Sequence, residues 1–136
     1  MNVDNPTRAR AWLTNAQSDM LAAVRLKDDV AHLACFHSQQ AAEKALKAVL
    51  TLHEGDVPLT HVLRELIAAC REAEVEVEPT ISARALSLEK YYIPTRYPDA
   101  LGWADAASAY NTRDAEQAIG EAQAVVDWAT RLLAGA

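Results

Sequence analysis

The chain has few of the residues that cross-link or punctuate small proteins. Its 136 residues include two cysteines, four glycines and one phenylalanine. There is no CxxC pair and no dense, even set of cysteines, so a disulfide framework is not predicted. Cys35 and Cys70 both fall among apolar helical positions. We therefore expect two reduced core thiols, as is usual in a cytoplasmic protein.

Long hydrophobic runs and a basic charge balance are also absent. No apolar run approaches the roughly 18 residues that a membrane span needs. The first residues, MNVDNPTRARAW, lack the apolar centre of a signal peptide. The formal net charge of -6 argues against a protein that coats nucleic acid or anionic membranes. The sequence predicts a soluble cytoplasmic protein with no membrane partner, and it leaves a local basic pocket open.

Several kinds of chemical site have no sequence signature here. The four glycines are scattered, so no glycine-rich phosphate loop is present. The histidines are His32, His37, His53 and His61, and none belongs to an HExxH motif or to paired ExxH motifs. No local Ser-His-Asp or Cys-His pattern occurs either. The sequence therefore predicts no metal site and no cofactor, and it identifies no catalytic residue.

Helical periodicity covers most of the chain. Hydrophobic residues make up 51% of it, and alanine, the strongest helix former, is abundant. Apolar residues recur at helical spacing from about residue 5 to 27, and over 30–52, 60–70, 79–92 and 112–133. No strand pattern or internal repeat is present. We predict an all-α fold, an up-and-down antiparallel bundle of four to five helices, in one domain over residues 1–136.

Local signals predict where these helices begin and end. The predicted caps and stops are Asn5 before Pro6, Asp28 or Asp29, Gly55, Thr60, and Asn111 or Thr112. Val24 and Leu33 are expected in the apolar faces of the first two helices. The acidic segment 72–78 is expected to form an exposed turn.

The segment from Tyr91 to Tyr110 interrupts the helical pattern. It holds five of the eight aromatic residues and two of the five prolines. A connection of this length in a small domain is usually functional or disordered, and its aromatic content argues against disorder. This segment is therefore the first candidate for a functional region.

Arg96 lies between two prolines in this segment and has restricted backbone freedom. Its guanidinium is a planar donor for phosphate or carboxylate, and Tyr92 and Tyr97 could stack on a base or on that guanidinium. A structural ion pair of Arg96 with an acidic residue is the alternative. His61, expected in the first turn of the third helix, is either a neutral imidazole near the positive helix end or a surface or capping histidine.

A polar insertion interrupts the second helix at residues 37–47. Gln40, Lys44 and Lys47 lie along one edge and could present amide and ammonium donors together. Glu43 and Lys47 form an i,i+4 pair, which is worth a few tenths of a kcal/mol on an exposed helix. This edge is either a solvated helix face or a face that binds a ligand or a partner.

Three stretches of the chain together resemble one family. They are CFHSQQAAEKALKA at 35–48, THVLREL at 60–66 and YYIPTRYPDA at 91–100. They resemble the second helix, the third helix and the loop before the last helix of HEPN domains, and the likeness spans about residues 8 to 133. The resemblance implies a helical bundle that forms homodimers, binds nucleotides, and pairs with a minimal nucleotidyltransferase in toxin–antitoxin-like modules.

Many HEPN proteins are metal-independent ribonucleases that use an arginine followed four to six residues later by a histidine, brought together across a dimer. Arg96 has no histidine at that spacing, and no other arginine of the chain has one either. The interpretation we favour is therefore a non-catalytic HEPN module that dimerises, binds a nucleotide or phosphate-bearing ligand and pairs with a nucleotidyltransferase. The predicted ligand contacts are Arg96, Tyr97, Tyr92, His61, Lys44, Lys47 and Gln40.

Two alternatives stay open. One is a divergent metal-independent ribonuclease toxin that acts on RNA through Arg96 and His61. The other is a purely structural scaffold protein, in which Arg96 is an ion-pair partner.

Overall fold

A computed structural model describes residues 2–92 and 105–136, and all regular structure in these residues is helical. The elements are α1 (Asn5–Leu26), α2 (Ala31–Glu54), α3 (Leu63–Glu72), α4 (Pro79–Leu86), the 3₁₀ turn η1 (Glu89–Tyr91), α5 (Ala106–Ala109) and α6 (Thr112–Ala134). The predicted all-α class is confirmed. α5 is a single short helix inside the segment where no helical period is visible in the sequence.

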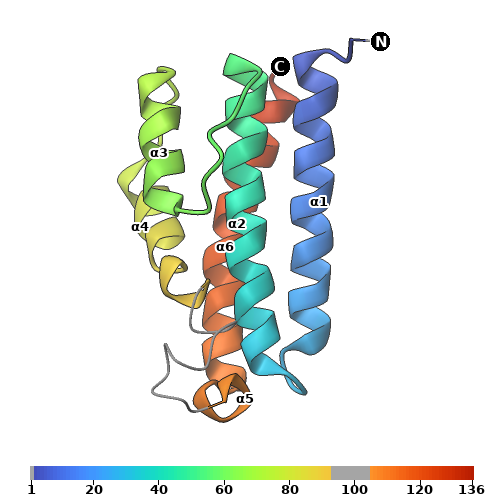
Figure 1. Cartoon of the computed structure of the whole chain (residues 1–136), viewed down its shortest axis with the longest axis vertical. Helices are drawn as coiled ribbons and strands as arrows, with labels where there is room; N and C mark the ends of the chain where they lie inside the picture. The colour runs from blue at the N-terminus through green and yellow to red at the C-terminus, as the bar shows by residue number, and fades with distance from the viewer. Residues whose placement is uncertain (1, 93–104) are drawn as a thin grey trace.

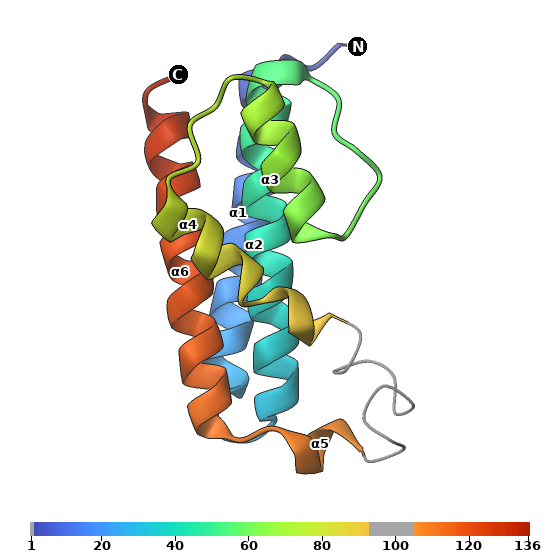
Figure 2. The same cartoon turned by 90° about the vertical axis from the view of Figure 1, so that its left-hand side faces the viewer.

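α2 is the central helix of the bundle. It contacts α1, α3, α5, η1 and α6, while α4 packs on α6 and α3. α1 and α2 are antiparallel neighbours joined by a tight turn, and α6 lies behind them (Figure 1). The segment after α2 returns along the bundle, so α3 runs in the same direction as α2 (Figure 2). This returning segment, residues 55–62, places His61 beside the middle of α2.

The first two helices begin close to their predicted positions but with different caps. Asp4 caps α1, because its Oδ1 accepts a hydrogen bond from the backbone N of Thr7 at 2.8 Å, and Asn5 is the first helical residue. Val30 precedes α2, and no side chain caps that helix. The predicted aspartate cap (residues 28–29) is wrong, since these residues belong to the turn that reverses the chain.

α3 begins at Leu63, later than predicted. Val62 is its N-cap residue, and the hydroxyl of Thr60 accepts a hydrogen bond from the backbone N of Val62 at 3.1 Å. The predicted cap by Thr60 is therefore wrong by two residues. His61 directly precedes the N-cap residue, so the expectation that it lies in the first turn of the helix is wrong.

Two other predicted helix signals are confirmed. Gly55 ends α2 with a φ of 82°, and a Cβ there would lie 3.3 Å from Oδ1 of Asn5. The positive φ favours glycine, and a Cβ would also require the side chain of Asn5 to shift. Asn111 caps α6 in a capping box with Asp114.

The core combines alanines of α1, α2 and α6 with leucines and valines of α2, α3 and α6 and with Leu88 after α4. Its largest fully buried apolar side chains are Leu46, Leu50, Leu63, Leu66, Leu88, Val49, Val125 and Val126. Val24 and Leu33, expected in the apolar faces, are 48% and 36% exposed, because no described helix packs on those sides. Val75 and Val77 are buried between exposed glutamates, so segment 72–78 is only half exposed. No helix in the described part of the chain is long and apolar enough to cross a membrane.

Both cysteines are free and fully buried. Burial raises the pKa of each thiol, Cys35 and Cys70, from 9.0 to about 12. The folded state therefore favours the protonated thiols. Their contribution to stability is complete below pH 9 and decreases as the pH rises from about 9 toward 12.

We expect neither thiol to react with a disulfide reagent at pH 8 in the native protein, and both to react once the chain is unfolded in denaturant. Reaction of one equivalent in the native state would show that the helix carrying the reacting cysteine opens locally.

Melting temperatures should fall as the pH is raised from 8 to 10.5, because the thiols of the unfolded chain ionise at a lower pH than the buried thiols.

Candidate functional site

Glu43, near the middle of α2, is the centre of a buried polar cluster. It is 3% exposed, and its Oε2 accepts a hydrogen bond from Nζ of Lys47 at 3.1 Å. Nδ1 of His61 lies 3.2 and 3.1 Å from the two carboxylate oxygens, and Nε2 of Gln40 lies 3.5 Å from Oε1. The predicted i,i+4 pair of Glu43 and Lys47 is confirmed. We call Glu43, Lys47, Gln40 and His61 the Glu43 cluster.

The position of α2 in the bundle explains why this polar stretch is buried. The side chains alone of Lys47 and Glu43 are 9% and 4% exposed, because α1 and the returning segment 55–62 flank this part of α2. The ammonium group of Lys47 also lies 5.5 Å from the ring centroid of Trp12 on α1, a cation–π contact. A buried ion pair of this kind depends on its additional hydrogen bonds.

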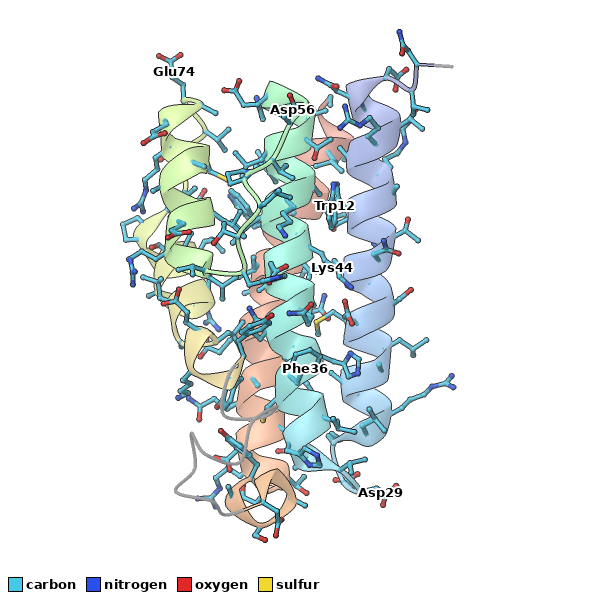
Figure 3. The ribbon with its side chains drawn as sticks, in the orientation of Figure 1. Trp12, Asp29, Phe36, Lys44, Asp56 and Glu74 are labelled. Carbon is cyan, nitrogen blue, oxygen red and sulfur yellow. The ribbon has the colours of Figure 1, made fainter. Side chains whose placement is uncertain are left out.

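A second buried carboxylate, Asp19, lies on α1. It is 8% exposed, and its two oxygens accept hydrogen bonds from Nδ1 of His37 at 2.8 Å and from Nζ of Lys44 at 2.7 Å. Lys44 extends from the middle of α2 toward α1 (Figure 3). These three residues form the Asp19 cluster. Each of the two carboxylates thus holds one lysine and one histidine.

The sequence prediction missed Asp19 and His37. A signal for Asp19 exists, because it shares helical spacing with Trp12, Ala16 and Ala23, which line the buried face of α1. A carboxylate on such a face needs a partner inside the protein.

Four rings connect the two clusters across the protein surface. The ring centroids of His37 and Phe36 are 5.5 Å apart, those of Phe36 and Tyr92 are 6.4 Å apart, and those of Tyr92 and His61 are 5.0 Å apart. Tyr92 and His61 are stacked with 15° between their planes. We call these four residues the ring row. Its two ends are the imidazoles that the buried carboxylates hold.

An open groove lies at the His61 end of the ring row. Its volume is about 490 Å³, and it is lined by Leu59, Thr60, His61, Val62, Arg64, Glu89 and Tyr92. Arg64 is 71% exposed and reaches Glu89 with Nη1 and Oε2 3.8 Å apart. Leu59 is fully exposed at the edge. The groove thus combines a stacked ring pair with an exposed guanidinium.

The structure brings five of the predicted ligand contacts into this region. Gln40, Lys47 and His61 meet at Glu43, Tyr92 stacks on His61, and Lys44 belongs to the Asp19 cluster. The lysines do not form a shared cationic edge, because each ammonium group is paired with a different carboxylate. Arg96 and Tyr97 lie outside the described residues, so their predicted roles stay predictions.

The arrangement of His61 suits it to proton exchange or to anion binding. A carboxylate oxygen only accepts hydrogen bonds, so Nδ1 of His61 carries the hydrogen that faces Glu43. Nε2 lies on the other side of the ring, and the side chain is 57% exposed. The neutral imidazole presents Nε2 as an acceptor, and the protonated one presents it as a charged donor.

Comparison with known proteins agrees with this architecture. The model of the HEPN domain family matches residues 9–132. A protein of Methanocaldococcus jannaschii named "Putative toxin MJ1304" is 29% identical over 130 residues, which cover 88% of this chain and 84% of the relative. The crystal structure of TT1696 from Thermus thermophilus is 39% identical with a TM-score of 0.83, covering 91% of this chain and 97% of that one. That of ST0689, described as an archaeal HEPN homologue, is 30% identical with a TM-score of 0.76, covering 92% and 97%. The chain therefore belongs to the HEPN domain family.

Proposed function

We propose that this HEPN protein is the toxin-like component of a two-protein module, and that its ring row and groove bind a nucleotide or another phosphate-bearing ligand. The observation that carries the ligand proposal is the stack of Tyr92 on His61 beside the exposed guanidinium of Arg64. The relative named as a putative toxin supports the toxin-like role. In this proposal the protein binds its ligand without transforming it.

Each part of the groove offers a contact that a nucleotide can use. Aromatic faces stack on bases with about 1–3 kcal/mol per base. The backbone N of Arg64 donates a hydrogen bond to Oε1 of Glu89 at 3.2 Å, whereas its guanidinium reaches Oε2 only at 3.8 Å, so the guanidinium can turn to a phosphate. Lys44 and Lys47 are held by buried carboxylates, so we assign the phosphate to Arg64, whose side chain is 71% exposed, together with the predicted contact Arg96.

Calorimetric titration of the purified protein with AMP and with ATP tests the ligand proposal. We expect Arg64→Ala to weaken binding of both nucleotides about tenfold, the effect of losing one charged hydrogen bond. The matched control is Arg10→Ala, since Arg10 is exposed on α1 and donates a hydrogen bond to the hydroxyl of Thr7, away from the groove. No detectable binding at millimolar nucleotide would contradict the proposal.

We further propose that the protein forms a homodimer and pairs with a nucleotidyltransferase. Co-purification from native lysate, followed by mass spectrometry and sedimentation of the recovered complex, tests both parts. A nucleotidyltransferase should be recovered in a fixed ratio to a dimer of this chain. A monomer with no such protein would contradict both parts and favour the scaffold interpretation.

One observation favours a second candidate function, a divergent metal-independent ribonuclease. A buried carboxylate orients the exposed imidazole of His61 in the way that carboxylates orient catalytic histidines. Here His61 would exchange protons through Nε2, and Arg96 would stabilise the phosphoryl group. RNA cleavage in the presence of a chelator should then be lost in both His61→Ala and Arg96→Ala. Cleavage that neither substitution reduces would exclude this candidate.

A further inference from the structure

The two polar clusters at the ends of the ring row each contain one carboxylate, one lysine and one histidine, and the Glu43 cluster also contains Gln40. Asp19 holds Lys44 and His37, and Glu43 holds Lys47 and His61. In each cluster the histidine uses Nδ1 toward the carboxylate and is the more exposed cationic group, with 30% exposure for His37 and 57% for His61. The lysines are at most 27% exposed.

The charge of this surface therefore depends on the protonation of its histidines. In each cluster the negative charge of the carboxylate and the positive charge of the ammonium group cancel. The cluster is therefore neutral when its imidazole is neutral, and it carries one positive charge when its imidazole is protonated. Arg64 and Glu89 line the same groove as His61 and pair with each other, and the carboxylate of Glu65 accepts a hydrogen bond from the hydroxyl of Thr60 in that lining. Among the described residues, His37 contacts the carboxylate of Asp19 on α1. The same carboxylate also binds Lys44 of α2.

An anionic ligand on the ring row would favour the protonated form of both imidazoles. Both rings are adjacent to an aromatic ring of the row, with His37 edge-on to Phe36 and His61 stacked on Tyr92. A planar base beside Phe36 and Tyr92 would thus have an imidazole on either side. The buried carboxylates hold each ring so that Nε2 is the nitrogen available to a ligand.

We infer that His37 is a second ligand contact, equivalent to His61, and that the protein takes up protons on these two histidines when it binds an anionic nucleotide. This inference rests on the proposed function. It assigns His37 to the binding face and makes binding of the ligand pH-dependent. By linkage, binding should weaken as the pH rises, by up to about tenfold per pH unit for each proton taken up.

Calorimetry of AMP binding in buffers of different ionisation enthalpy counts the protons taken up. We expect net uptake at pH 7.5 for the wild type, and a smaller uptake with about tenfold weaker binding in His37→Asn and in His61→Asn. The matched control is His53→Asn, since His53 is exposed in the last turn of α2. Adenosine, which lacks the phosphate, should bind without proton uptake. Protons exchanged by AMP itself are the same in every variant. Differences in the proton count between variants therefore come from groups of the protein.

Imidazole ¹⁵N spectra of the free protein test the geometry independently. In their neutral forms, His37 and His61 should be Nδ1–H tautomers because Nδ1 faces a carboxylate, whereas exposed His53 should not share that preference. AMP binding without a buffer-dependent enthalpy, or an unchanged proton count in a folded His37→Asn variant, would overturn the inference and leave the proposed function intact. Absence of any AMP or adenosine binding would overturn both.

Discussion

Replacing Glu43 by alanine should lower the free energy of unfolding by about 3–5 kcal/mol. The substitution leaves the ammonium group of Lys47, whose side chain is 9% exposed, without its carboxylate. The cost of an unpaired buried charge is larger than the energy of the pair itself. In a domain of this size the melting temperature should fall by about 10–20 °C. Thermal and denaturant unfolding monitored by circular dichroism measure the change.

A double variant distinguishes two causes of the lost stability, the unpaired charge of Lys47 and the lost side-chain volume. Glu43→Leu combined with Lys47→Met removes both charges and should regain most of the stability that Glu43→Leu alone loses. The exposed pair of Lys27 and Glu116 provides the control, because its side chains are 34% and 59% exposed. Breaking that pair should change stability by less than about 1 kcal/mol. A Glu43→Ala variant as stable as the wild type would mean that water reaches Lys47.

Tyr92→Leu should weaken nucleotide binding by about 5- to 150-fold. Leucine keeps an apolar side chain beside Phe36 and His61 but removes the aromatic face, and stacking of one base is worth about 1–3 kcal/mol. Calorimetric titration with AMP at constant pH and salt measures the loss. Tyr92→Phe is the matched variant, since it retains the ring and should bind nearly as well as the wild type.

The comparison of these two variants also distinguishes stacking from folding. Both must give the far-ultraviolet spectrum and the melting behaviour of a helical bundle before the affinities are compared. If Tyr92→Leu and the wild type bind AMP equally, the base does not use the ring row, and the phosphate contact through Arg64 would be the main one. If Tyr92→Phe loses as much as Tyr92→Leu, the phenol hydroxyl rather than the ring makes the contact.

The helices were predictable because their signals are local. The stop at Gly55 and the capping box at Asn111 depend on a few neighbouring residues, and the apolar stripe of α6 depends on spacing alone. The errors at the starts of α2 and α3 have another origin. The turn at residues 28–29 and the returning segment 55–62 take their shape from the helices on either side, so the residues that resemble caps do not cap.

The partners of the candidate site were not predictable in the same way. Glu43 with Lys47 is an i,i+4 pair and was expected, but His61 is 18 residues from Glu43, and Lys44 is 25 residues from Asp19. Those contacts depend on α1 and α2 being antiparallel neighbours and on segment 55–62 returning along α2. The same packing buries a helix edge that from its composition could have been solvated.

The sequence by itself determined the helical class, most helix positions, the resemblance to HEPN domains and the absence of a histidine after Arg96. Periodicity, capping and motif spacing are properties of the chain alone, so they can be recognised from the order of its residues. Only the tertiary structure decided that two buried carboxylates each hold a lysine and a histidine, and that four rings join those clusters on one surface. Contacts between residues that are distant in the sequence arise only when the helices pack together, and no local pattern in the chain specifies which of them meet.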